Sequence, residues 1–138
     1  YPEYKTVTMS KVDYDGDGAV ESMYDEIEGM KVVLHQAMSQ YSAKVGDGTM
    51  FGFYGDAYPY SFIDTNKDGQ ITEDEAAFPN QYKLFTPRLL KAAYNYMFTV
   101  KDPGAYIHNG KYVLQLMFDS IEDLSAVSGV TTDGLTRP

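Results

Sequence analysis

The chain contains 138 residues, of which 43% are hydrophobic and 22% charged, so its composition indicates one globular domain spanning residues 1–138. Its formal charge of -9 argues against nucleic acid as a partner, because phosphate binding depends on Lys and Arg, and it favours cations as ligands. The absence of cysteine excludes disulfides, zinc-thiolate sites and covalently attached haem. No apolar run approaches the length of a membrane span.

The first part of the chain predicts an extended arm followed by a long helix. Residues 1–12 contain Pro2 and show no helical period, so we expect them to form the arm. Ser22 is a suitable N-cap for a helix over residues 22–44, with Asp25 and Glu26 in its first turn. Apolar side chains recur there every three or four positions, at Met23, Ile27, Met30, Leu34, Ala37, Met38 and Tyr41.

The middle of the chain is aromatic and rich in turn residues. Residues 49–61 interleave aromatic side chains with Gly and Pro and have no helical face, so they predict a structured aromatic loop or a short hairpin. A short helix is expected over residues 72–78, ended by Pro79.

The last third of the chain predicts two helices and a tail. Thr86 followed by Pro87 is a typical N-cap and first helical residue, for a helix that ends near residue 100. A final helix is expected over residues 111–126, followed by an irregular tail over 127–138. We therefore expect an all-α fold, a small helical bundle carrying two acidic loops, the N-terminal arm and the aromatic Gly-rich loop.

Residues 64–75 have the full pattern of an EF-hand-type calcium loop, and we call them the second loop. Calcium binds six to eight oxygen atoms, and alternate residues of a tight loop direct their oxygens inward around a glycine at position 6. Gly69 holds that position, Thr72 can act through a water at position 9, and Ile71 is expected to pack behind the loop. The expected ligands are Asp64, Asn66, Asp68, the carbonyl of Gln70, and Glu75 at position 12. The alternative is a solvated Asp/Asn turn.

Residues 13–26, which we call the first loop, begin with the same pattern and then depart from it. Gly18 holds position 6, but Tyr24 stands at position 12, where the closing carboxylate belongs. The candidate replacements for that carboxylate are Glu21 at position 9 and Asp25 or Glu26 just beyond position 12. The expected ligands are Asp13, Asp15, Asp17, the carbonyl of Ala19, Glu21 and Glu26, so the chain is predicted to hold two structural Ca²⁺ ions. The long insert between the loops means that they need not face each other.

Several segments together resemble the C-terminal, haem-free region of large exported multi-haem c-type cytochromes. They are DYDGDG, AYPY, DTNKDG, FTPRLLKAAYNY, KDPGAYIHNGKY and LQLMFDSIEDL, and the resemblance covers residues 12–124. It implies export and a helical domain beside an electron-transfer chain. The cytochromes carry many CxxCH haem sites, which this chain lacks, so covalent haem is excluded here.

The two histidines raise the question of haem ligation in a partner protein. His35 and His108 could serve as axial ligands, but nothing in their spacing supports this. We interpret His35 as a partly exposed helix residue and His108 as a turn residue hydrogen-bonded near Asn109.

Thirteen tyrosines suggest either a tyrosine-rich core or tyrosine-rich interfaces. We expect a secreted, calcium-binding structural protein that self-assembles into an extracellular filament through tyrosine-rich contacts. The alternative is a monomeric calcium-stabilised accessory module associated with multi-haem cytochromes. A cytosolic calcium sensor ranks third, and an enzyme, such as a hydrolase pairing a carboxylate with His108, is not expected. The chain begins at Tyr1 without Met, which is typical of a chain that has lost its signal peptide or of a trimmed fragment.

Overall fold

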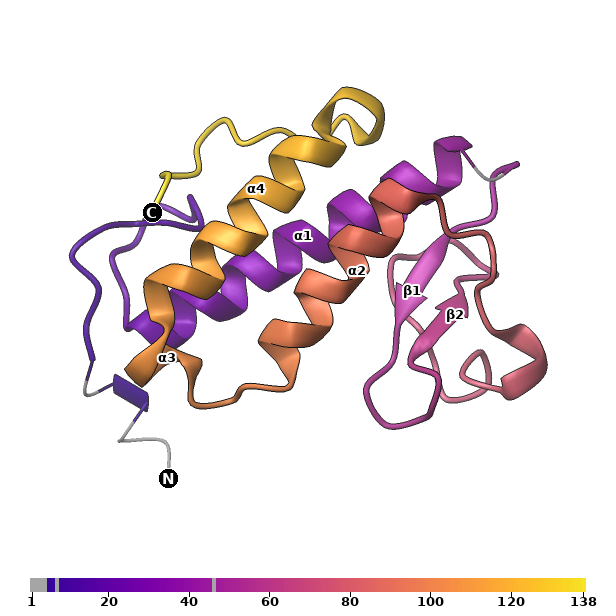
Figure 1. The fold of residues 1–138 in the computed structure, drawn as a ribbon, viewed down its shortest axis with the longest axis horizontal. Coiled ribbons are helices and arrows are strands. Elements are labelled where there is room, and N and C mark those ends of the chain that lie inside the picture. The colour runs from indigo at the N-terminus through magenta and orange to yellow at the C-terminus, as the bar shows by residue number, and fades with distance from the viewer. Residues whose placement is uncertain (1–4, 7, 46) are drawn as a thin grey trace.

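The computed structural model describes residues 5–6, 8–45 and 47–138. Its framework is three helices, α1 (Met23–Val45), α2 (Pro87–Val100) and α4 (Gly110–Ser128), with a short α3 (Ala105–His108) before α4. Figure 1 shows that α4 runs along α1 and that α2 lies beside both helices, while the sheet packs against α1. The three long helices agree with the expected ranges to within about two residues at each end.

The expected all-α class is wrong, because two strands form a small sheet. Strands β1 (Phe51–Phe53) and β2 (Ser61–Ile63) pair antiparallel, with Phe51 opposite Ile63 and Gly52 opposite Phe62. The molecule is therefore a mixed α and β fold, and of the two interpretations of residues 49–61 the hairpin is correct. Three-residue strands carry too little alternation to be recognised from periodicity, and the tertiary packing of Phe51 and Phe62 helps to stabilise them.

The sheet is held against α1 by two buried serines. Ser42 Oγ accepts the backbone N–H of Phe51 at 2.7 Å, and Ser39 Oγ donates to the Phe51 carbonyl at 2.8 Å. The Ser42 hydroxyl in turn donates to the carbonyl of Ser39 at 2.7 Å. The free edge of β1 is thus satisfied by helix side chains instead of by a third strand.

The expected short helix over residues 72–78 is also wrong. The segment makes a single turn, in which the N–H of Ala76 donates to the carbonyl of Thr72 at 3.0 Å, and a 3-10 helix η2 (Phe78–Asn80) follows. Pro79 lies inside η2 and does not end a helix before it. The Asn80 side chain donates to the carbonyls of Ile63 at 2.9 Å and of Glu75 at 2.8 Å, which fixes this turn to β2.

The helix starts form as the sequence predicts. Ser22 Oγ accepts the N–H of Asp25 at 3.1 Å and donates to its carboxylate at 2.8 Å. Thr86 Oγ1 accepts the N–H of Leu89 at 3.1 Å, with Pro87 as the first residue of α2. Such caps satisfy backbone donors that have no partner within the helix.

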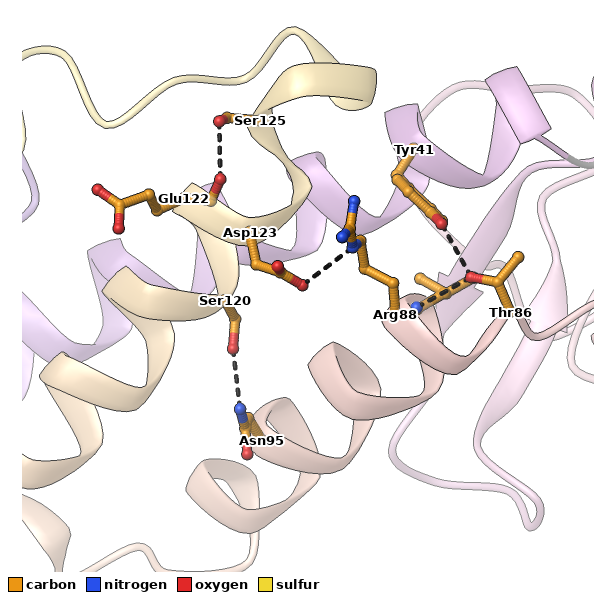
Figure 2. Close-up of polar contacts among 9 residues, drawn as sticks. Tyr41, Thr86, Arg88, Asn95, Ser120, Glu122, Asp123 and Ser125 are labelled. Carbon is orange, nitrogen blue, oxygen red and sulfur yellow. Dashed lines mark hydrogen bonds and ion pairs between the residues drawn. The ribbon is translucent and has the colours of Figure 1, made fainter.

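Polar contacts fix α2 against the other two long helices (Figure 2). Asn95 donates to Ser120 of α4 at 2.9 Å, and Arg88 lies 3.4 Å from the Asp123 carboxylate. Thr86 shares a 2.9 Å hydrogen bond with Tyr41 of α1. The core between the helices is apolar, and its fully buried side chains include Met30, Leu34, Met38, Leu89, Leu114, Met117, Ile121 and Leu124.

Both ends of the described chain lie against the framework. Ser10 donates its N–H to the carbonyl of Glu21 at 2.9 Å, so this part of the expected arm runs antiparallel to the start of α1. Tyr1–Tyr4 of the arm lie outside the described residues. After α4 the tail is irregular, as expected, and the Thr136 N–H donates to the carbonyl of Tyr14 at 3.1 Å.

Candidate metal sites

The second loop follows β2 directly and turns tightly around its first carboxylate. Asp64, which is buried, accepts the N–H of Gly69 at 2.7 Å and of Asp68 at 3.3 Å. Asn66 Oδ1 accepts the N–H of Asp68 at 3.2 Å, and Asp68 Oδ1 accepts that of Gln70 at 2.9 Å. The residues expected at positions 1, 3 and 5 therefore curl the backbone around one point.

Glu75, the last residue of this loop, closes it. Its Oε2 accepts the N–H of Thr65 at 2.8 Å, and its Oε1 accepts the N–H of Thr72 at 3.0 Å. The hydrogen bonds from Thr72, and then those from Thr65, hold the pKa of Glu75 below its usual range despite partial desolvation. Its carboxylate oxygens come within 4.8 Å of those of Asp64 and Asp68, as expected of a shared ligand set.

Ile71 lies behind the second loop, as position 8 predicts. Its side chain is buried and rests on Gly52 of β1, where a Cβ would overlap it. The glycine in the strand thus makes room for the residue that anchors the loop to the sheet.

The first loop repeats the backbone pattern of the second. Asp13 accepts the N–H groups of Gly16 at 2.8 Å and Gly18 at 2.9 Å. Asp15 Oδ1 accepts the N–H of Asp17 at 3.2 Å, and Asp17 Oδ1 accepts that of Ala19 at 2.8 Å. In both loops, therefore, the carboxylate at position 1 accepts the N–H at position 6, and the side chains at positions 3 and 5 each accept the N–H two residues later.

Glu26 takes the place of the missing closing carboxylate. Its side chain is 0% exposed, and its Oε2 accepts the N–H of Tyr14 at 2.9 Å and of Asp15 at 3.2 Å. Its Oε1 accepts the N–H of Glu21 at 3.1 Å. Glu75 makes the equivalent bonds to positions 2 and 9 of its own loop. The first loop is thus a variant with two additional residues before its closing glutamate.

The sequence left the choice between Asp25 and Glu26 open, and the structure decides it. Asp25 is engaged by the Ser22 cap at the start of α1, while Glu26, one residue later on the helix, points into the loop. Successive helix residues lie about 100° apart, so the two carboxylates cannot serve the same site.

The carboxylates of the first loop form two groups that share Asp15. Carboxylate oxygens of Asp15, Glu21 and Glu26 lie within 4.8 Å of one another, as do those of Asp13, Asp15 and Asp17. Burial raises the pKa of Asp15 to about 7. The Asp17 side chain, with partial desolvation, raises the pKa of Glu21 to about 7, and the same contact with Glu21 lowers the pKa of Asp17.

Neighbouring carboxylates add to both raised pKa values, because Glu26 and Asp17 repel a charge on Asp15 and Asp17 repels a charge on Glu21. Among the residues that the structure describes, no Lys or Arg side chain forms an ion pair with either cluster. All the grouped donors are oxygen atoms, which suits a hard divalent cation such as Ca²⁺ and does not suit a metal that prefers nitrogen or sulfur. The donor set therefore fits calcium in both loops.

The two loops lie apart and do not form a paired EF-hand unit. In Figure 1 the first loop lies near the start of α1 at one end of the molecule, and the sheet that leads to the second loop lies at the other end. Within the described ranges, the bridges outside the sheet are Met9 with Ser22 and Phe62 with Gln81, so neither joins the loops.

Sequence reasoning missed two features of the first loop. Gly29 of α1 lies against the Asp15 carboxylate, where a Cβ would overlap it. The sequence signal for this close approach was the presence of a glycine inside a strongly predicted helix. The second feature is the C-terminal segment, whose Gly134 carbonyl lies where a Cβ on Gly16 would point; no local pattern predicts this contact.

Neither histidine is placed as a free ligand. His35 Nε2 accepts the N–H of Phe53 at 3.1 Å, and burial lowers the pKa of His35, so a neutral imidazole supports β1. His108 was expected in a turn, but it is the last residue of the short helix α3, and its Nε2 lies 3.2 Å from the Asp102 carboxylate. Asp102 also lines a cleft of about 280 Å³ together with Glu28. The Glu28 carboxylate is paired with Lys31 at 2.7 Å.

Comparison with known proteins supports part of the resemblance seen in the sequence. The chain is 36% identical over 89 residues to the C-type polyheme cytochrome OmcB of Geobacter sulfurreducens in two strains, which covers 59% of this chain and 12% of the cytochrome. It is 34% identical over 89 residues to OmcC of the same organism, covering 59% of this chain and 11% of that protein.

The matched part is thus a small fraction of the length of either cytochrome. No family model and no solved structure matches. Among the described helices, none combines the length and hydropathy needed to cross a bilayer. What the comparisons establish is that more than half of this chain, which contains no cysteine for thioether-linked haem, is similar to a segment of polyhaem cytochromes.

Proposed function

We propose that this chain is a calcium-binding structural domain in which each acidic loop holds one Ca²⁺ ion. The observation that carries the proposal is the repeated hydrogen-bond pattern of the two loops, each closed by a buried glutamate, Glu26 or Glu75. Acidic turns without a bound ion would not be expected to show the same hydrogen-bond pattern twice. The first loop keeps this pattern although two additional residues precede its closing glutamate. The ions would supply the positive charge that the clustered carboxylates otherwise lack.

The role of the ions is structural rather than regulatory. A calcium sensor opens a pair of helices to expose a methionine-rich groove, which requires loops that act together. Here the loops lie apart, and the large methionines of the core, Met30, Met38 and Met117, are fully buried between three helices. Each ion would instead fix one end of the fold. The proposal includes no catalytic reaction.

The domain is proposed to act outside the cell and to self-associate into filaments through exposed aromatic side chains. Some tyrosines lie in the core and others on the surface. Those that are buried are Tyr14, Tyr41, Tyr82 and Tyr106, and those that are exposed include Tyr58, Tyr94 and Tyr112. Large exposed aromatic surfaces on a soluble domain are typical of interaction sites. Export follows from the resemblance to exported cytochromes and stays a prediction.

A second function is favoured by the similarity to OmcB and OmcC. In it, the chain is a monomeric calcium-stabilised accessory domain that associates with multi-haem cytochromes. Its mass in solution at high concentration with calcium separates the two functions, because only the structural polymer predicts large assemblies of the purified chain.

Isothermal titration calorimetry with Ca²⁺ tests the sites directly. The wild-type chain is expected to bind two ions, and Glu26→Gln and Glu75→Gln are each expected to weaken one site by at least about tenfold, as even indirect partners of a metal do when changed. Asp25→Asn is the matched control, since Asp25 caps α1 and is not one of the clustered carboxylates of the first loop. Heat of binding that is unchanged in both glutamine variants would overturn the assignment.

Electron microscopy of the purified chain in calcium, before and after addition of a chelator, tests the structural role. Ordered filaments that fray on chelation are the expected result. Filaments that persist unchanged would separate assembly from calcium, and uniform small particles in both conditions would favour the accessory domain.

A further inference from the structure

Charge is unevenly distributed along this acidic chain. Between Glu75 and Asp119 the only acidic residue is Asp102, whereas the same stretch carries Lys83, Arg88, Lys91, Lys101 and Lys111. This stretch contains all of α2 and the start of α4. A chain with a formal charge of -9 therefore carries one stretch of sequence with excess positive charge, which includes α2.

The outward side of α2 is apolar between its lysines. Leu90, Tyr94 and Phe98 follow one another at four-residue spacing and are 55%, 74% and 42% exposed. Lys91 and Lys101 lie on the same side, while Leu89, Ala92 and Ala93 face the core. An exposed row of apolar side chains flanked by lysines is typical of a helix face that binds another protein.

A groove runs beside this face, between α2 and the connection from β1 to β2. Its volume is about 570 Å³, and it is lined by Tyr60, Tyr94, Met97, Phe98, Lys101 and Asp102. The Lys101 ammonium lies 5.4 Å from the centre of the Tyr60 ring, which places a positive charge at the aromatic wall. Such a site suits an aromatic side chain accompanied by carboxylates.

The same chain carries a surface of that chemistry at the end of the second loop and the start of η2. Phe78 is 62% exposed, and it follows Glu73 and Asp74, which are also exposed. The Asn80 side chain ties this turn to the carbonyl of Glu75, the residue that closes the second loop. We call Glu73, Asp74 and Phe78 the acidic knob.

We propose that the groove beside α2 binds the acidic knob of a second copy of this chain. Phe78 enters between Tyr60, Tyr94 and Phe98, and the knob carboxylates face Lys101. In Figure 1 the knob lies beyond the sheet at the edge of the molecule, on the side away from α2. The two surfaces are distinct on each molecule, so the contact is head-to-tail and continues into a filament unless it closes into a ring.

This inference rests on the self-association included in the proposed function, and it explains a dependence on calcium. Glu73 and Asp74 belong to the second loop, and Phe78 follows it on a turn that Asn80 bonds to Glu75, so an ion in that loop would hold the knob in one conformation. Preorganisation of one partner strengthens binding without adding contacts.

Two complementary variants test the contact by sedimentation velocity in calcium. Phe78→Ala removes the knob and leaves the groove, whereas Tyr94→Ala impairs the groove and leaves the knob. Both side chains are exposed, so the fold is retained, and circular dichroism checks this. Each variant alone is expected to sediment as a monomer at concentrations at which the wild-type chain forms large species. Val32→Ala, exposed on α1, is the control that keeps wild-type assembly.

Mixing the two variants gives the sharpest outcome. One productive contact is still possible between an intact knob and an intact groove, so the mixture is expected to form dimers and nothing larger. Lys101→Glu mixed with a Glu73→Lys, Asp74→Lys variant provides a second test, in which reversed charges restore assembly that neither variant shows alone.

The possible failures are distinguishable. Large assemblies that persist in Phe78→Ala and Tyr94→Ala would overturn this contact and leave self-association standing. A wild-type chain that is monomeric at every concentration, while calorimetry still detects two calcium ions, would overturn the contact and self-association together and leave the calcium sites.

Discussion

The Asp15 carboxylate lies directly against Gly29 of α1, so that a methyl group at position 29 would overlap its Oδ2 atom. This close approach joins the third position of the first loop to the second turn of the helix that closes the loop. One substitution at this position should therefore change calcium affinity without lowering the stability of the fold.

Gly29→Ala is expected to weaken calcium binding at the first loop while leaving the fold intact. Alanine favours a helix over glycine by about 1 kcal/mol, so α1 itself gains stability. Asp15 must move away from the site, which should reduce affinity by about tenfold. Calorimetry and thermal unfolding measure the two effects, and Gln36→Ala at an exposed position of α1 is the control. Unchanged affinity would show that Asp15 is not a ligand.

Calcium binding is expected to release protons near neutral pH. Burial raises the pKa of Asp15 to about 7, and the Asp17 side chain raises that of Glu21 to about 7. Below this pH the ion must displace protons, so the apparent affinity falls as the pH falls through about 7. Titrations in buffers of different ionisation enthalpy measure the protons released, and identical heats in all buffers would contradict the shifts.

The same raised pKa values predict that the calcium-free fold is weakened at high pH. The folded chain holds protons on Asp15 and Glu21 that the unfolded chain has already lost, so their contribution disappears as the pH rises through about 7. Added calcium should remove this loss. Urea unfolding with and without a chelator, on either side of neutral pH, measures the difference.

His35 is expected to give the opposite dependence. Burial holds its folded pKa below the ordinary value of 6.5, so below that pH the unfolded chain binds a proton that the folded chain does not. Stability should therefore fall as the pH falls below about 6.5. His35→Gln preserves an acceptor for the Phe53 N–H and removes the titration. The unfolding free energy of the wild-type chain should therefore fall relative to that of His35→Gln on acidification; a difference that does not change with pH would contradict this.

Ser42→Ala is expected to destabilise the fold by about 1–3 kcal/mol, the cost of leaving the buried Phe51 N–H without an acceptor. Ser125→Ala is the matched control, because that hydroxyl donates to the Glu122 carbonyl on the exposed surface (Figure 2). Its cost should stay within about 0.5 kcal/mol. Equal losses would mean that Ser42 does not fix β1 to α1.

Calcium is also expected to protect the C-terminal segment. Tyr14 donates its N–H to Glu26 and accepts the Thr136 N–H with its carbonyl, so the closing glutamate and the tail share one peptide segment. Arg137 adds ion pairs to Asp119 at 2.8 Å and Glu122 at 3.0 Å. Hydrogen exchange at Thr136 should slow when calcium is added. Exchange that is insensitive to calcium in wild type and Glu26→Gln alike would separate the tail from the site.

Much of the helical framework was predictable because its signals are local. Ser22, and Thr86 followed by Pro87, mark helix starts through bonds within one turn, and the apolar spacing of α1 records the face that it buries. The second loop was also predictable from the sequence, because its whole hydrogen-bond pattern lies within the twelve residues from Asp64 to Glu75.

The errors concern segments whose structure depends on distant residues. Strands β1 and β2 are three residues each and form because Phe51 packs in the core and Ser42 satisfies its N–H. The segment after the second loop makes one turn and a 3-10 helix instead of the expected helix, because Asn80 bonds back to Ile63. Neither interaction can be read from neighbouring residues.

By itself, therefore, the sequence determined the long helices, their caps and the positions of the two acidic loops, because each depends on contacts within a few residues. The tertiary structure decided that the fold contains a sheet, and that Glu26, not Asp25, closes the first loop. It also placed Gly29 and the C-terminal segment against that loop and set the aromatic groove beside α2. These features depend on the directions of side chains brought together from distant parts of the chain, which spacing along the sequence does not record.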